Sequence, residues 1–354
     1  MKRIEAGGGK KWREWCLLFF LGAVTLLCFA NAVRSAEFVK LQMSELEFVS
    51  PGLQGALDYA GARSVWEENQ KREHPLEYVN WTQTDGVQVS APGLGTAEEC
   101  SALFLCGRSD LLFPGYAVLD AESRYGCLLS SALSGKLFGG KDTRGLTVEA
   151  QGRTLEVLDV IESREVFLVC EAGENDPCYF DRAAVSCRSG EIGKTEESYQ
   201  QLCGGWKRME SRVLVWITQS ACFLIPCILW IYLAYYCAEM LRTARRSERA
   251  DRMEKIIWTF LLYLVLAGGI LVLIRGVQIP EDMIPTKWSD FEFWTEYGKK
   301  LGASCRLLIW SEKKIPDFPI WKEFARTLQW AAGAAAGEAV FLRGFWRMQR
   351  SKKS

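Results

Sequence analysis

The chain has 354 residues, with 43 basic and 43 acidic side chains and a formal net charge of zero. That balance gives no reason to expect nucleic acid as a partner. The mean hydropathy of -0.02 averages apolar and polar stretches, so local windows are more informative. The single histidine, His74 before Pro75, argues against a Ser-His-Asp or Cys-His centre, and we expect it at a surface turn.

Four apolar runs divide the chain. Residues 15–32, 213–241 and 256–275 are each long enough to cross roughly 30 Å of hydrocarbon at about 1.5 Å per residue, and we predict a transmembrane helix over each. The fourth run, residues 327–342, carries Glu338 and is rich in alanine and glycine. Hydropathy alone leaves this last run undecided.

The distribution of basic residues decides whether the fourth run spans the membrane. These residues cluster in segments 1–14, 242–255 and 343–354. Lys and Arg beside membrane spans favour the cytoplasmic side, and placing all three clusters there requires an even number of crossings between them. We therefore predict four spans in the cell membrane, with both termini cytoplasmic. The residues before the first span, followed by Ala30-Asn31-Ala32, also suit a cleavable signal peptide, and this alternative stays open.

The topology leaves two extracytoplasmic segments, residues 33–212 and 276–326. Within the first, Ser50-Pro51-Gly52 suits a helix start, with serine as the cap and proline at the first helical position. The pattern predicts strands over 80–90 and 101–106, a short helix over 130–138 and a hairpin over 146–161 with its turn at Gly152. The domain is therefore expected to be mixed α+β.

One block carries a family resemblance. Helix 130–138 closes with an apolar pair and a glycine, and two further turns follow, each with a glycine suited to tight backbone geometry. The residues of this motif are Leu137, Phe138, Gly139, Asp142, Gly145 and Gly152. The block resembles the periplasmic core of MacB-like (FtsX-like) ABC transporter permeases. The resemblance implies an α+β extracytoplasmic domain (MacB-like periplasmic core) on a four-helix α-helical transmembrane region, in a bacterial membrane.

The chain contains no catalytic or nucleotide-binding motif, so we predict no enzyme activity and no cofactor in it, and any ATP-driven work requires a separate cytosolic ATPase subunit. The segment Gly190–Thr195 lacks the first glycine of a phosphate-binding loop, because Arg188 stands there. The implied partners are an ABC ATPase and a second permease copy, as a homodimer or heterodimer. Substrate, direction of transport and oligomeric state stay open.

An alternative function is a membrane-anchored extracytoplasmic sensor or scaffold that does not transport. The connection 242–255 favours it, because this segment is highly charged and has no glycine, unlike the usual coupling segment of such permeases. We expect the connection to contact either lipid headgroups or a protein partner. The candidate contact residues are Arg245, Arg246, Glu248, Arg249, Asp251 and Arg252.

Small residues inside two spans suggest close helix packing. Gly333 and Gly337 form a Gly-x-x-x-Gly spacing in the fourth run, and Gly268-Gly269 offer a notch in the third. Glu338 lies near the cytoplasmic end of its span, and we expect it to pair with Arg343 or to reach the interface.

Thirteen cysteines are distributed over spans and outer segments. Disulfides are possible among those outside the membrane, with no pairing deducible. The chain has no Cys-x-x-Cys spacing and one histidine, so we predict no metal site.

Overall fold

The computed structural model describes residues 6–43, 45–52, 55–120, 125–140, 142–174, 176, 178–188, 191–246, 252–276 and 291–353. The chain divides into two compact units. One, which we call the helix unit, comprises Met1–Leu41, Val213–Pro280 and Ile320–Ser354. The other, which we call the sheet unit, comprises Gln42–Arg212 and Glu281–Pro319. Each unit is therefore built from segments that are far apart in the sequence.

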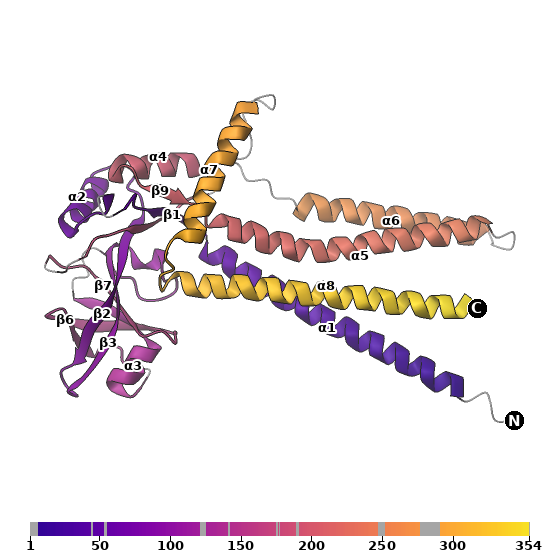
Figure 1. Ribbon diagram of the computed structural model, residues 1–354, viewed down its shortest axis with the longest axis horizontal. Coiled ribbons are helices and arrows are strands. Elements are labelled where there is room, and N and C mark those ends of the chain that lie inside the picture. The colour runs from indigo at the N-terminus through magenta and orange to yellow at the C-terminus, as the bar shows by residue number, and fades with distance from the viewer. Residues whose placement is uncertain are drawn as a thin grey trace. The chain divides into compact units, whose positions relative to one another are not determined.

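Four long helices form the helix unit (Figure 1): α1 (Ala6–Gln42), α5 (Arg212–Arg246), α6 (Arg252–Gly276) and α8 (Asp317–Lys353). Among the described residues, three helical stretches are long and apolar enough to cross a membrane, namely Trp15–Gln42, Arg212–Arg246 and Arg252–Ile274. The chain is thus a membrane protein. The predicted fourth run does not meet this criterion, although it lies inside α8.

All four long helices extend beyond the predicted spans, and α1 and α8 do so the most. The first continues ten residues beyond 32 to Gln42, because no helix-breaking residue lies between. The last begins at Asp317, so the end of the predicted outer segment 276–326 is helical and continuous with run 327–342.

Small residues bring the helices of the helix unit together. A Cβ added at Gly337 would collide with Thr25 of α1, and one at Gly333 would stand 3.7 Å from the Cys28 sulfur. A Cβ at Gly269 of α6 would collide with Trp230 of α5, whose Nε1 donates to the Val265 carbonyl at 2.8 Å. Close approach without a side chain is therefore what permits both helix pairs.

Nine strands form the sheet, in the order β3-β7-β4-β6-β5-β2-β8-β1-β9. An additional pairing of β3 with β2 closes six of these strands into a ring. The pairs β3–β7 and β4–β6 are parallel, and the others are antiparallel. The strands are β1 (Leu46–Val49), β2 (Tyr78–Ala91), β3 (Thr96–Gly107), β4 (Gly126–Ser130), β5 (Thr147–Ala150), β6 (Arg153–Ile161), β7 (Phe167–Glu171), β8 (Arg182–Val185) and β9 (Lys207–Met209).

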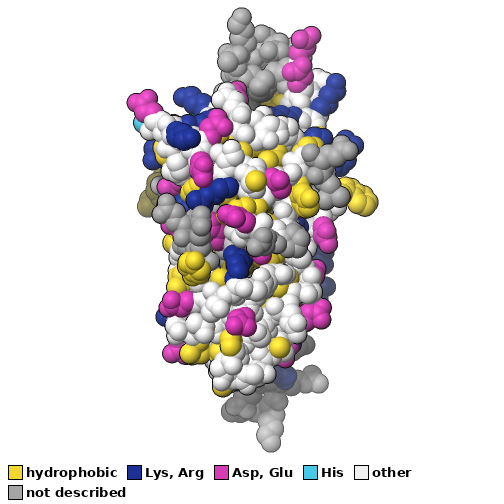
Figure 2. Space-filling view, turned by 90° about the vertical axis from the view of Figure 1, so that its left-hand side faces the viewer, with side chains coloured by type: hydrophobic (Ala, Val, Ile, Leu, Met, Phe, Trp, Pro, Cys, Tyr) yellow, Lys and Arg dark blue, Asp and Glu magenta, His cyan; other side chains and the backbone are white. Residues whose placement is uncertain are grey.

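Helices of the sheet unit cover this sheet, namely α2 (Tyr59–Gln70), α3 (Ser131–Phe138), α4 (Ile192–Cys203) and α7 (Phe291–Trp310). The largest buried cluster lies between the ring strands and α3, with Val89, Phe104, Leu129 and Leu137 fully buried. Strands β4 and β7 are buried on both faces, which is why they read as largely apolar runs. On the face shown in Figure 2, side chains of both charge signs are interspersed with apolar ones.

The predicted helix and hairpin of the motif block are present. Ser130 caps α3 by accepting from the Leu133 amide at 3.1 Å, and Gly139 ends the helix with a φ of 73°. Gly145 and Gly152 have φ of 78° and 71°, so each occupies a conformation that other residues rarely adopt. The remaining motif residues are Leu137, which is buried, Phe138, which packs against the core, and Asp142, which is exposed.

The predicted helix start at Ser50-Pro51-Gly52 is wrong. The Ser50 amide instead donates to the Asp181 carbonyl at 3.0 Å, and Gly52 has a φ of 121° that no helix contains. The helix starts at Tyr59, where Asp58 accepts from the Gly61 amide at 2.8 Å. The helix is thus capped by Asp58, eight residues after Ser50, because the segment around Ser50 is bonded to the sheet instead.

All thirteen cysteines are free thiols. Cys127 of β4 lies opposite Cys170 of β7, and both are buried. Burial raises the pKa of both thiols, that of Cys170 to about 12. These thiols are therefore apolar core groups at neutral pH.

Candidate functional site

The candidate site is the surface of the sheet unit where the second predicted outer segment packs. Helix α7 lies on β9, the last strand of the sheet order. Its inward side chains follow helical spacing, with Tyr297 and Leu301 half-buried and Ser304 and Leu308 buried. Because an exposed edge strand invites pairing with other chains, α7 protects the edge that β9 presents.

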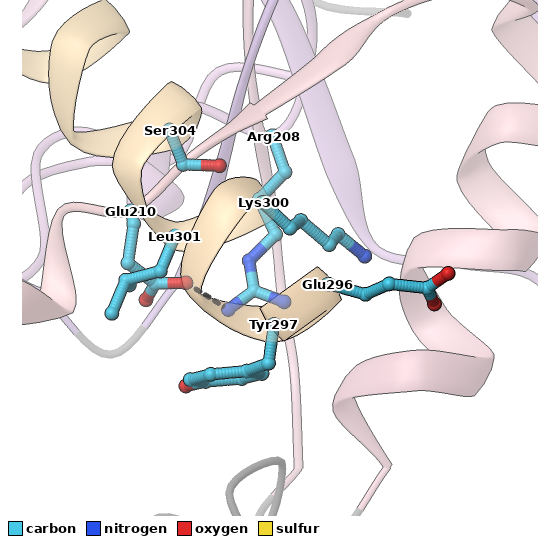
Figure 3. A pocket seen from close by; sticks show the side chains of 7 residues that line it. All are labelled: Arg208, Glu210, Glu296, Tyr297, Lys300, Leu301 and Ser304. Atoms are coloured by element: carbon cyan, nitrogen blue, oxygen red, sulfur yellow. Dashed lines mark hydrogen bonds and ion pairs between the residues drawn. The ribbon is translucent and has the colours of Figure 1, made fainter. Parts of the chain in front are cut away.

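A pocket of about 390 Å³ lies between α7 and β9 (Figure 3). At its centre Arg208 of β9 donates to Glu196 of α4 at 3.0 Å and also to Glu210. The lining side chains are those of Arg208, Glu210, Glu296, Tyr297, Lys300, Leu301 and Ser304.

Each buried carboxylate at this pocket has more than one cationic partner. Glu196 also pairs with Lys300 of α7 at 3.1 Å, and Glu210 with Arg212 at 2.9 Å. Buried ion pairs are stable only when their hydrogen bonds are well made, and loss of one partner leaves an uncompensated charge. The network therefore ties α7 to both β9 and α4.

A second attachment follows α7. Residues 312–317, which we call the strap, lie between α7 and the start of α8. Lys314 Nζ donates to both carboxylate oxygens of Asp181, at 2.6 and 2.7 Å, and stands 5.4 Å from the centre of the Trp81 ring. Arg182 of β8 donates to the Glu312 carbonyl at 2.6 Å. Both contacts are charge-assisted and fix the strap to the sheet.

Backbone and core contacts complete the strap. The Ile315 amide donates to the Gln83 side chain at 2.9 Å, and the Ile315 side chain is buried with Val79, Trp81 and Leu105. The Lys314 amide donates to Asp317 at 3.0 Å, at the first residue of α8. The strap is therefore an integral part of the sheet unit.

Two acidic groups near the strap have raised pKa values. Burial, followed by the nearby charge of Asp317, raises the pKa of Glu47 in β1 to about 7, against the opposing effects of Arg182 and Lys313. Burial also raises the pKa of Asp317, despite the same two cations and Lys314. The carboxyl pair thus favours holding a proton at mildly acidic pH.

The sheet unit is linked to the membrane helices at neighbouring elements. Helix α1 ends at Gln42, just before β1, and α5 starts at Arg212, just after β9. Strands β1 and β9 are hydrogen-bonded neighbours, with Phe48 opposite Arg208. Helix α8 continues directly from the strap. Three of the four long helices therefore join the sheet through one small region.

The charged connection between α5 and α6 is described only in part. Arg245, Arg246 and Arg252 are exposed, and Arg245 and Arg246 end α5 while Arg252 begins α6. Glu248, Arg249 and Asp251 lie outside the described residues. A role of this segment in partner or lipid contact stays a prediction.

The glycines differ in their surroundings. Gly333, Gly337 and Gly269 lie at helix contacts, whereas a Cβ at Gly268 would meet no atom of the described structure within 4 Å. Only one glycine of the predicted notch therefore faces another helix, because adjacent helical residues point about 100° apart.

The expectation for Glu338 is wrong. Its side chain is 5% exposed, and neither carboxylate oxygen has a hydrogen-bond partner among the described residues. Arg343 is exposed and forms no ion pair with it. Helix α8 turns Glu338 toward the bundle interior, which the helical position alone did not reveal.

Two other expectations concern chemistry. His74 is exposed in a bend, as predicted for a surface turn. Within the described part of the chain, no group of three metal-ligating side chains comes together. The absence of catalysis in this chain stays a prediction.

Sequence reasoning missed the strap and the pocket. Some signal was present, since Tyr297, Leu301 and Leu308 recur at helical spacing, and Pro316-Asp317 marks a helix start. The partners of these residues lie more than 80 positions away, so no local pattern identifies them.

The solved structures that are similar to this chain include the following two. One is the periplasmic region of MacB from Actinobacillus actinomycetemcomitans, with 11% identity and a TM-score of 0.36, covering 48% of this chain and 90% of that one. The other is the extracellular domain of the noncanonic ABC-type transporter YknZ from Gram-positive bacteria, with 11% identity and a TM-score of 0.34, covering 47% of this chain and 99% of that one.

These two structures are of the class of domain that the block around Leu137-Phe138-Gly139 resembles. No known protein family matches the chain, and no curated protein matches it. The functional argument therefore rests on the residues of this chain.

Proposed function

We propose that this chain is the permease subunit of a MacB-like ABC transporter, in which a separate cytosolic ATPase drives helix motions that change the extracytoplasmic sheet unit. The observation that carries the proposal is the shared attachment of α1, α5 and α8 to β1, β9 and the strap. A shift of any one of these helices acts on hydrogen-bonded neighbours in the sheet. This arrangement suits mechanical coupling, and the transported substrate is unassigned.

The proposal includes four spans with both termini in the cytoplasm and the sheet unit outside. Packing of α8 against the apolar helices supports the fourth span. Ala331 and Ala334 are buried with Ala32 of α1 and Ile225 of α5, and Phe345 lies 6.1 Å from Tyr236 between ring centres. A helix with alanine and glycine at such contacts crosses the membrane by packing closely in spite of its modest hydropathy.

Topology is tested with a tag at the C-terminus of the full chain in sealed cells. We expect the tag to react with antibody only after the membrane is permeabilised, because four crossings return the tail to the cytoplasm. A tag inserted at the exposed turn near Leu94 is the control. We expect it to react in cells whose outer membrane is permeable and whose cytoplasmic membrane is still sealed. Labelling of the C-terminal tag before permeabilisation contradicts the fourth span.

The transport function is tested by purifying the tagged chain from its native membrane, with and without a non-hydrolysable ATP analogue. We expect an ABC ATPase to co-purify, with an amount that changes with nucleotide. Replacing Arg245, Arg246 and Arg252 by glutamine is expected to reduce it severalfold. Replacing Arg343 and Arg347, which are exposed on α8, is the matched control.

The second candidate is an extracytoplasmic sensor or scaffold without transport. The charged, glycine-free connection 242–255 favours it. Under this function the chain purifies without an ATPase and with a partner bound to the sheet unit. The same purification therefore separates the two candidates.

A further inference from the structure

Glu338 is a buried acidic side chain of the helix unit that the proposed function does not use. It lies on α8, one turn after Ala334, which is fully buried with Ala331, Ala32 and Ile225. The preceding residue, Gly337, is pressed against Thr25 of α1. The carboxyl group is thus inside the contact of α8 with its neighbours, with neither oxygen bonded among the described residues. A charged carboxylate in such a place is strongly disfavoured.

The neighbouring helices offer no counter-charge. Residues 15–32, 213–238 and 256–274 contain no Asp, Glu, Lys, Arg or His. The titratable groups there are thiols and phenols, which carry a positive charge in neither protonation state. Those on the parts of α1 and α5 that pack against α8 are Cys28, Cys222, Cys227, Tyr232, Tyr235 and Tyr236. On α8 itself, the nearest charged side chain is the exposed Arg343.

We propose that Glu338 is a proton-binding site of the helix unit. The carboxylate takes one proton from water and is held as the neutral acid when α1, α5 and α8 are packed as described. It returns that proton to water when these helices separate. A second copy of the chain does not supply a counter-ion in the packed arrangement, because both oxygens are covered by the chain's own atoms.

The inference rests on the proposed fourth span for the apolar surroundings of α8. Protonation then reports the packing of this helix, since a closed bundle stabilises the acid and an open one the carboxylate. Helix motion and proton uptake are therefore linked. The ordinary pKa of a glutamic acid is about 4.3. At any pH above this value, opening of the bundle at Glu338 releases a proton.

Infrared spectra of the full chain in phosphatidylcholine bilayers test the site. We expect wild type at about pH 7 to show the C=O band of a protonated carboxyl group that is missing from Glu338→Gln. The band is expected to remain in Glu239→Gln, a control at an exposed acid near the end of α5. Identical wild-type and Glu338→Gln spectra overturn the proposal. Glu338→Ala gives the same comparison if the glutamine variant does not accumulate.

Thermal unfolding gives an independent readout, because glutamine imitates the neutral acid. We expect equal midpoints for wild type and Glu338→Gln at about pH 4, and a progressively lower wild-type midpoint as the pH rises. Parallel curves up to about pH 9 overturn the proposal. A C-terminal tag exposed outside the cell would refute the fourth span through a separate measurement, and lack of a co-purifying ATPase would refute transport, so the failures are distinguishable.

Discussion

The sheet unit and the helix unit are each stabilised internally, but by different interactions. In the sheet unit, buried charges such as Arg208, Glu196 and Glu210 are paired, and they join elements distant in sequence. In the helix unit, glycines such as Gly337 and Gly269 let helices approach, and the buried Glu338 has no partner among the described residues. Directional bonds therefore fix the first region, whereas the second relies on close contact that can be remade after a shift.

The largest expected effect is at the centre of the pocket. Arg208→Ala leaves Glu196 and Glu210 buried with one cation fewer each, and we expect β9 and α4 to lose about 3–5 kcal/mol of local stability. Amide hydrogen exchange of these elements in the full chain measures the loss. Lys207→Ala, at an exposed position of the same strand, is the control. Unchanged protection in Arg208→Ala would remove the ion network from the account of this region.

The next effect concerns pH. The pKa of Glu47 is raised in the folded chain from an ordinary 4.5 to about 7. Its contribution to stability is therefore fully present below about pH 4.5 and is lost as the pH rises through about 7. We expect Glu47→Gln to flatten this part of the midpoint-versus-pH curve in thermal unfolding. Glu77→Gln, at a largely exposed acid, should retain the slope.

Two glycines of one helix test the packing of the helix unit. Gly337→Ala forces a Cβ against Thr25, and we expect a loss of about 1–3 kcal/mol. Gly333→Ala places its Cβ at an ordinary 3.7 Å from Cys28, and we expect little change. Thermal unfolding in detergent micelles compares them. Equal midpoints for the two variants would mean that α1 and α8 separate without cost.

The smallest effect is expected at the strap. Lys314→Met removes the bond to Asp181, whose side chain is 39% exposed, so solvent limits the loss to about 1 kcal/mol. We expect faster hydrogen exchange in residues 312–319 and unchanged exchange in β4 and β7. Lys299→Met, at an exposed position of α7, serves as the control. Faster exchange throughout the sheet would show that the strap stabilises more than its own segment.

Local pattern predicted the parts of this chain whose partners are local. Helix α3, with its Ser130 cap and Gly139 end, and the following hairpin were predicted because capping and turn residues act within a few positions. The helix start at Ser50 was mispredicted because the long-range bond of its amide to Asp181 overrode a good local cap.

The candidate site was beyond the reach of such patterns. Lys314 and Asp181 are 133 positions apart, and Ile315 and Gln83 are 232 positions apart. The burial of Glu338 depends on the rotation of α8 against α1 and α5, which an alanine-rich helix leaves open. Ring closure by the β2–β3 pair and the parallel β3–β7 pair likewise needs three-dimensional information.

The pairing of β1 with β8 and β9 also bears on the order of synthesis. Strand β1 leaves the ribosome directly after the first membrane helix, but its partners follow more than 130 residues later. Until Val185 of β8 has been made, Leu46 and Phe48 have no strand to pair with. This edge of the sheet must therefore assemble after the six-stranded ring. The strap adds only when the chain beyond α6 has been made, so the sheet unit folds in stages.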